Sequence, residues 1–103
     1  MGKPMRIRAR AESGVVEVKV LISHVMETGF RKDQEGELIP ARFIQSLTVT
    51  HQGRTVLSAQ WGTGVSANPF LSFKFRGGRA GETLTVAWID NAGDTRSDEA
   101  VIG

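Results

Sequence analysis

The feature that most constrains this chain is a two-residue alternation of apolar and polar side chains in several short segments. The clearest case is VVEVKVLI at residues 15–22, where alternate residues from Val16 to Ile22 are all apolar and share one face. Successive side chains of a β-strand point to opposite sides, so this alternation indicates a strand with one buried face. No window of eleven residues shows an apolar stripe at helical spacing. The pattern therefore predicts an all-β chain.

Similar segments recur along the chain, and glycine-containing turns separate many of them. We expect strands over about 5–12, 15–22, 43–51, 54–61, 70–75, 83–90 and 95–102. Ser13-Gly14, Gln52-Gly53 and Asn91–Gly93 are turn signals between successive strands. Residues 24–40 are polar and irregular, which predicts a solvated hairpin tip or a long crossing loop. Seven short strands with one buried face each predict a single immunoglobulin-like β-sandwich over residues 1–103, in preference to a small barrel.

Composition excludes several classes of function. Thirteen Lys and Arg against eleven Asp and Glu leave a net charge of +2, which is low for a chain built to bind nucleic acid. The absence of cysteine excludes disulfides, thiolate metal ligands and a cysteine nucleophile. No run approaches the roughly eighteen apolar residues that span a bilayer, and the basic N-terminal residues are not followed by the apolar stretch of a signal peptide. We expect no membrane insertion.

Few residues suggest catalytic or metal chemistry. His24 and Glu27 lie three residues apart, and His51 is distant in the sequence. Together they leave open an alternative function, a small cytoplasmic metal-binding or enzymatic β domain. Their spacing matches no helical zinc motif, and the chain has no G-x-S-x-G nucleophile motif. We therefore expect no catalytic residue, no metal and no cofactor.

Two other features have simpler structural explanations. The glycine clusters at 62–64 and 77–81 lack the Lys-Ser/Thr ending of a phosphate-binding loop, so we expect them to be turns. Arg6, Arg8 and Arg10 form a row that could follow a nucleic-acid backbone, but no aromatic residue interleaves it to stack on bases. Charged side chains on an edge strand also discourage aggregation, and this explanation is favoured.

Four segments resemble the SoxZ family: HVMETGFRKD at 24–33, LIPARFI at 38–44, TVLSAQWGTGVSANPFLSFKF at 55–75 and AWIDNAGDTRSDEA at 87–100. The resemblance runs from about Arg6 to Ala100 in the expected order. Its most specific parts are Trp61-Gly62, Val65-Ser66, Asn68-Pro69 and the segment 90–94. Val25 stands where the family has proline, which removes the φ restraint of a proline from this loop.

The resemblance implies a specific role. SoxZ proteins are immunoglobulin-like sandwiches that pair with SoxY, whose C-terminal Gly-Gly-Cys-Gly-Gly arm holds the intermediates of thiosulfate oxidation on its thiol. A cytochrome complex, a manganese hydrolase and a sulfur dehydrogenase act on that arm in turn. The family resemblance thus implies a non-catalytic carrier subunit without a cofactor, exported to the periplasm together with SoxY. A cysteine-free chain agrees with this role.

Strand alternation also predicts where individual aromatic residues lie. Trp61 and Trp88 both fit inward-facing strand positions, and we expect both in the core. Trp88 shares a face with Leu84 and Val86 and should be buried, whereas Trp61 adjoins a glycine-rich loop, which leaves half-burial as an alternative for it. Phe70 lies on the opposite face from Leu71 and Phe73. If those two fill the core, Phe70 should be at least partly exposed; the alternative is that Phe70 covers the end of the core. Two loops, 24–30 and 62–70, contain residues that a lone sandwich does not need. The expected partner contacts are His24, Met26, Glu27, Trp61, Asn68 and Phe70.

Overall fold

The computed structural model describes residues 2–103, which form seven strands. Their bounds are β1 (Arg6–Glu12), β2 (Val15–Leu21), β3 (Ile44–His51), β4 (Arg54–Gln60), β5 (Phe70–Arg76), β6 (Thr83–Asp90) and β7 (Thr95–Val101). Each strand agrees with its sequence-based range to within one residue at either end. Within residues 2–103, no helix is long and apolar enough to cross a membrane.

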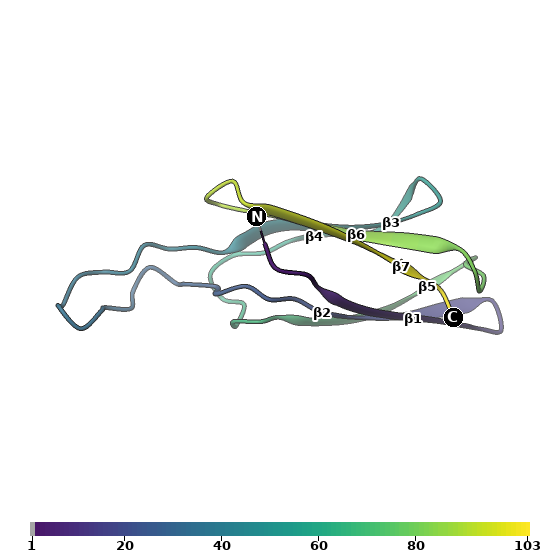
Figure 1. The fold of residues 1–103 in the computed structure, drawn as a ribbon, viewed down its shortest axis with the longest axis horizontal. Helices are drawn as coiled ribbons and strands as arrows, with labels where there is room; N and C mark the ends of the chain where they lie inside the picture. The colour runs from purple at the N-terminus through teal and green to yellow at the C-terminus, as the bar shows by residue number, and fades with distance from the viewer. Residues whose placement is uncertain (1) are drawn as a thin grey trace.

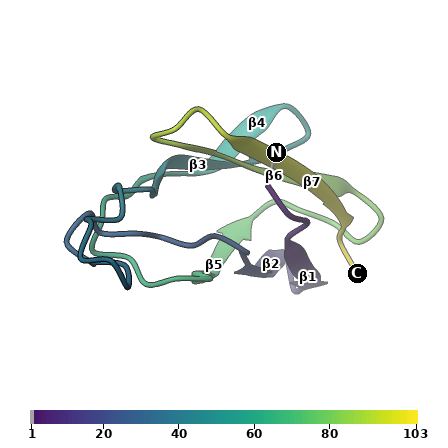
Figure 2. The same cartoon turned by 60° about the vertical axis from the view of Figure 1, so that its left-hand side comes forward.

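The strands form two antiparallel sheets that pack face to face (Figures 1 and 2). The three-stranded sheet has the order β1-β2-β5, and the four-stranded sheet has the order β4-β3-β6-β7. This arrangement confirms the predicted all-β sandwich. Because β2 leads to β3 in the other sheet, the segment between them crosses from one layer to the other.

Two tight turns connect the most regular hairpins. Ser13 and Gly14 have φ values of 52° and 80°, and Gln52 and Gly53 have φ values of 50° and 77°. Positive φ at both central residues is the mark of the turn that matches the twist of two-residue hairpins. The turn signals at both positions are therefore confirmed.

The core lies between the two sheets and consists of the alternating faces that the sequence predicted. On β2, alternate residues from Val16 to Val20 are fully buried. They face a layer from the four-stranded sheet that includes Leu47, Val49, Leu84, Val86 and Trp88. Such apolar burial contributes about 25 cal/mol per Å² and drives the two layers together.

The segment between β2 and β3 forms an extended arm, which we define as residues 24–42. It projects beyond the end of the sandwich (Figure 1). Two isolated bridges, Glu27 with Arg42 and Lys32 with Leu38, hold its two sides together as an irregular hairpin. The prediction of a solvated hairpin tip and the prediction of a crossing loop are thus both confirmed by this segment.

Trp88 is 3% exposed, as predicted, and its ring meets the ring of His24 edge to face with centroids 5.1 Å apart. A Cβ atom added at Gly2 would lie 2.3 Å from the Trp88 ring, so the N-terminal segment passes directly over it. The indole Nε1 of Trp88 is buried without a hydrogen-bond partner among the described residues. Trp88 therefore stabilises this end of the core by packing alone.

We predict that Trp88→Ala lowers the free energy of unfolding by about 3–5 kcal/mol, because it removes a buried aromatic ring and leaves a cavity. Denaturant unfolding at neutral pH measures this loss. Trp88→Phe should cost much less, since it keeps a ring and removes an unpaired N–H. Trp61→Ala, at a half-buried tryptophan, is the matched control and should also cost less. Equal losses in the two alanine variants would contradict this account of the core.

Candidate functional site

A buried carboxylate organises the end of the sandwich from which the arm projects. Asp90 is the last residue of β6 and is 1% exposed, although it is charged. It lies on the inward face of β6 because it continues the alternation of Leu84, Val86 and Trp88. A carboxylate at such a position has to be hydrogen-bonded, since an unpaired buried charge is strongly destabilising.

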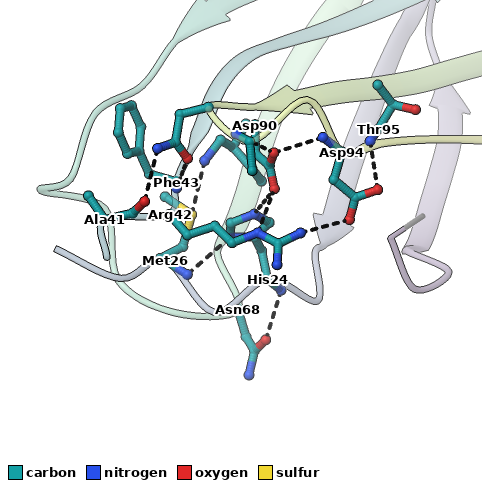
Figure 3. Close-up of polar contacts among 12 residues, drawn as sticks. His24, Met26, Ala41, Arg42, Phe43, Asn68, Asp90, Asp94 and Thr95 are labelled. Atoms are coloured by element: carbon teal, nitrogen blue, oxygen red, sulfur yellow. Dashed lines mark hydrogen bonds and ion pairs between the residues drawn. The ribbon is translucent and has the colours of Figure 1, made fainter. Parts of the chain in front are cut away.

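Four donors surround the two oxygens of Asp90 (Figure 3). Oδ1 accepts the backbone amides of Ala92 and Asp94, both at 2.9 Å. Oδ2 contacts Nε2 of His24 at 3.0 Å and accepts Nε of Arg42 at 3.2 Å. One carboxylate thus joins the β6–β7 turn, the start of the arm and the end of the arm.

His24 has both ring nitrogens engaged. Its Nδ1 accepts the backbone N–H of Met26 at 3.0 Å, which leaves the ring proton on Nε2 to be donated to Asp90. The side chain is also buried, with 4% of its surface exposed. With both nitrogens engaged inside the protein, this ring has no free lone pair for a metal ion or for a substrate proton.

Further polar contacts fix the arm to the β6–β7 turn. Asn91 Oδ1 accepts the amide of Phe43 at 2.8 Å, and Asn91 Nδ2 donates to the carbonyl of Ala41 at 2.9 Å. Arg42 Nη2 donates to Asp94 at 3.2 Å (Figure 3). These bonds and those of Asp90 hold the base of the arm at several points.

The loop before β5 is fixed to the same cluster. Asn68 Oδ1 accepts the amide of His24 at 3.1 Å, and the carbonyl of His24 accepts the amide of Asn68 at 2.9 Å. Asn68 has a φ of 51°, a left-handed conformation that asparagine tolerates well. The next two residues, Pro69 and Phe70, bring the chain into β5.

The structure brings all six expected partner-contact residues to this one end, but in different environments. His24 and Met26 are buried at 8% and 5% exposure, so they shape the loop from inside and offer little surface to a partner. Glu27 accepts two bonds from the Arg31 guanidinium, whose hydrogen bonding lowers the Glu27 pKa. The other three line a shallow hollow, where Trp61 is half-buried, Asn68 is exposed and Phe70 is 62% exposed.

The three residues of the alternative metal or enzymatic site do not come together. His51 ends β3 at the opposite end of the sheet and contacts Glu82 Oε1 at 2.8 Å, a bond that lowers the Glu82 pKa. His24 and Glu27 lie at the arm end and contact Asp90 and Arg31 instead. In residues 2–103, no three His, Asp or Glu side chains are grouped to hold a metal ion.

Sequence reasoning did not identify Asp90 and Arg42 as site residues. The available signal was the position of Asp90 on the apolar face of its strand, because an acid there requires a buried partner. Burial by itself raises the pKa of the Asp90 carboxyl. The hydrogen bonds from His24, from Arg42 and from the turn amides outweigh burial and lower that pKa below its ordinary value.

We predict that Asp90→Asn lowers the free energy of unfolding at pH 7 by about 1.5–3 kcal/mol, the range for a hydrogen bond to a charged group, because the half-exposed Arg42 is not left as a buried unpaired charge. A lowered folded-state pKa stabilises the fold above the ordinary aspartate range, and this stabilisation is lost as the pH falls through the folded pKa. The difference between parent and variant should therefore shrink in acid. Denaturant unfolding between neutral pH and about pH 3 measures it, since unfolded aspartate titrates near 4. Glu35→Gln, at an exposed side chain of the arm, should have little effect; a difference that grows in acid would contradict the role of Asp90.

Comparisons with solved structures show what this fold resembles. Superoxide reductase (neelaredoxin) from Archaeoglobus fulgidus superposes with a TM-score of 0.63 at 24% identity, covering 97% of this chain and 89% of that protein. A hypothetical protein from Pyrococcus horikoshii gives a TM-score of 0.63 at 15% identity, covering 99% of this chain and 88% of that protein. At these identities the likeness concerns the fold, which is the immunoglobulin-like sandwich of the superoxide reductase. A search of curated proteins found no match.

The comparison with protein families is more specific. Residues 5–101 match the family described as sulphur oxidation protein SoxZ, which is nearly the whole chain. The matched range contains the buried cluster, the arm and the loop before β5. The chain therefore belongs to the SoxZ family of sulfur oxidation proteins.

Proposed function

We propose that this chain is the non-catalytic subunit of a SoxYZ carrier, which binds SoxY and helps to present the cysteine-bearing arm of SoxY to the enzymes of thiosulfate oxidation. The family match over residues 5–101 carries this proposal. In this proposal the chain pairs with SoxY and is exported together with it to the periplasm. The cytochrome complex, the hydrolase and the sulfur dehydrogenase are its transient partners.

The residues themselves support a role without catalysis. The chain has no cysteine on which a sulfur intermediate could be held. His24, the buried histidine, uses both ring nitrogens in internal hydrogen bonds. His51 contacts Glu82 away from the arm end. Neither histidine is paired with a nucleophile, so the described side chains offer no assembled general base.

Phe70 is the proposed anchor for SoxY. Its side chain is 62% exposed, and its cross-strand neighbour Leu21 is 42% exposed, so together they form an apolar patch beside the loop that Asn68 holds in place. An exposed aromatic residue on a fixed backbone is a typical interface anchor, because little entropy is lost when a partner covers it.

We predict that Phe70→Ala weakens SoxY binding by about 1–3 kcal/mol, near the hot-spot range. The melting temperature should change by no more than about two degrees, because the ring contributes little to the core. Titration calorimetry with purified SoxY and thermal melts of the variant measure the two effects. Val101→Ala removes an exposed apolar side chain from the other sheet and should leave binding unchanged. Unchanged binding in Phe70→Ala would place the SoxY interface elsewhere.

The carrier role is tested by following sulfur. We predict that incubation of the SoxYZ complex with thiosulfate and the pathway enzymes adds mass to SoxY and leaves the mass of this chain unchanged, because it has no thiol. Intact-mass spectrometry resolves the two subunits. A persistent sulfur adduct on this chain would contradict the proposal, as would failure to form a complex with SoxY.

A further inference from the structure

The outer faces of the two sheets differ sharply in charge. The strand register aligns the outward residues of β1, β2 and β5 in four rows: Arg6–Leu21–Phe70, Arg8–Lys19–Ser72, Arg10–Glu17–Lys74 and Glu12–Val15–Arg76. Eight of these twelve residues are charged, and six of the eight are cations. We call the face that carries Arg6, Arg8, Arg10, Lys19, Lys74 and Arg76 the cationic face. All six cations are exposed.

The outer face of the four-stranded sheet has almost no charge. The register aligns fourteen outward residues there, and Glu99 alone among them is charged. The full set is Ser46, Thr48, Thr50, Thr55, Ser58, Gln60, Thr83, Thr85, Ala87, Ile89, Thr95, Ser97, Glu99 and Val101. A dense charge on an outer sheet face is therefore not a general requirement of this fold.

The positive charge of the cationic face is largely uncompensated within the chain. In residues 2–103 its one ion pair is between Lys19 and Glu17, with 3.8 Å between Nζ and Oε1. Arg8 lies directly opposite Lys19 across the strands, a like-charge pair that destabilises a sheet. By contrast, Arg31, Arg42 and Arg96 elsewhere are all bonded to carboxylates.

Edge protection explains charge on this face but not its sign. Charged side chains of either sign discourage edge pairing, yet the face has six cations against two carboxylates and a net charge of +4. The other charged residues of the chain, seven cations and nine carboxylates, have a net charge of −2. The cations are thus concentrated on one side of a nearly neutral molecule.

We propose that the cationic face docks the acidic surface of an enzyme that acts on the carrier complex. This inference rests on the proposed function, and charge complementarity favours a carboxylate-rich protein surface as the occupant. An open groove of about 660 Å³ on this side of the sheet is lined by residues that include Arg10, Glu17, Lys74 and Arg76. Cores of permanent interfaces are depleted in charge, so a face this rich in charge suits a partner that associates quickly and leaves again.

A protein surface fits better than a nucleic acid. The middle rows of the face present no aromatic side chain on which a base could stack, and Phe70 lies at one end. The rest of the chain has a net negative charge, which would repel a long phosphate backbone. Phe70, the proposed SoxY anchor, lies in the row at one end of the cationic face, and Arg76 lies in the row at the other end.

The test compares two matched double charge reversals in the complex with SoxY. Arg8→Glu with Arg10→Glu changes the cationic face, and Arg54→Glu with Arg79→Glu makes the same change in net charge at exposed positions elsewhere. SoxY binding of each variant is measured first. Association rates with the cytochrome complex, the hydrolase and the sulfur dehydrogenase are then measured by stopped flow at ionic strengths of about 0.01 and 0.3 M, where screening lengths differ severalfold.

We expect the Arg8/Arg10 variant to bind SoxY normally and to associate with at least one enzyme about tenfold more slowly at low ionic strength. That difference should largely disappear at high ionic strength, and the control variant should behave like the parent.

Equal rates for all three proteins with all three enzymes would overturn the inference and leave the carrier role intact. Loss of SoxY binding confined to the Arg8/Arg10 variant would overturn it by assigning the face to SoxY. Salt-dependent binding of duplex DNA, lost in that variant while enzyme association is unchanged, would also overturn it. Failure of the parent chain to bind SoxY would instead contradict the proposed function.

Discussion

The buried carboxylate of Asp90 is the interaction on which the arm end of the molecule depends. Its two oxygens accept bonds from the β6–β7 turn and from both sides of the arm base, so three chain segments meet at one charged group. A buried charge that loses a partner is strongly destabilising. These segments are therefore coupled, because displacing one leaves the carboxylate incompletely paired. The loop with Asn68 joins the same cluster through the backbone of His24.

Much of the fold could be predicted from the sequence because strand alternation is a local property. Each of β2 and β6 buries every second residue, and the turns at Ser13-Gly14 and Gln52-Gly53 adopt the backbone conformation that a two-residue hairpin requires. The burial of Trp88 followed from the same alternation, and of the two alternatives for Phe70 the structure shows the exposed one. The two-residue alternation could not predict how the seven strands divide into sheets of three and four, because that division depends on contacts between distant segments.

The candidate site was less predictable for the same reason. His24 and Asp90 are separated by 66 residues, and Arg42 and Asp90 by 48, so no local spacing connects them. The sequence indicated that the loops 24–30 and 62–70 carry unexplained residues, but their burial depends on which segment lies against them. The sequence suggested His24 and Met26 as partner contacts but did not indicate that both are buried against the cluster. Only Asp90 carried a local signal, an acid on an apolar strand face.

The two proposals assign two kinds of partner to one small sandwich, and the outer face of its three-stranded sheet suggests how both could be served. A lasting interface needs apolar or small neutral side chains at its centre, because each buried charge must be desolvated and paired. A brief encounter benefits from exposed charge, which raises the association rate without requiring tight packing. In this chain the exposed aromatic ring of Phe70 stands at one end of the three-stranded sheet, while the rows beyond it carry cations of which, among residues 2–103, Lys19 alone is paired with a carboxylate. If SoxY covers the first region, the second stays open to solvent, and the carrier can approach an enzyme without releasing its permanent partner. The rigid cluster around Asp90 then matters to both associations, because it fixes the loop that leads into Phe70 and β5.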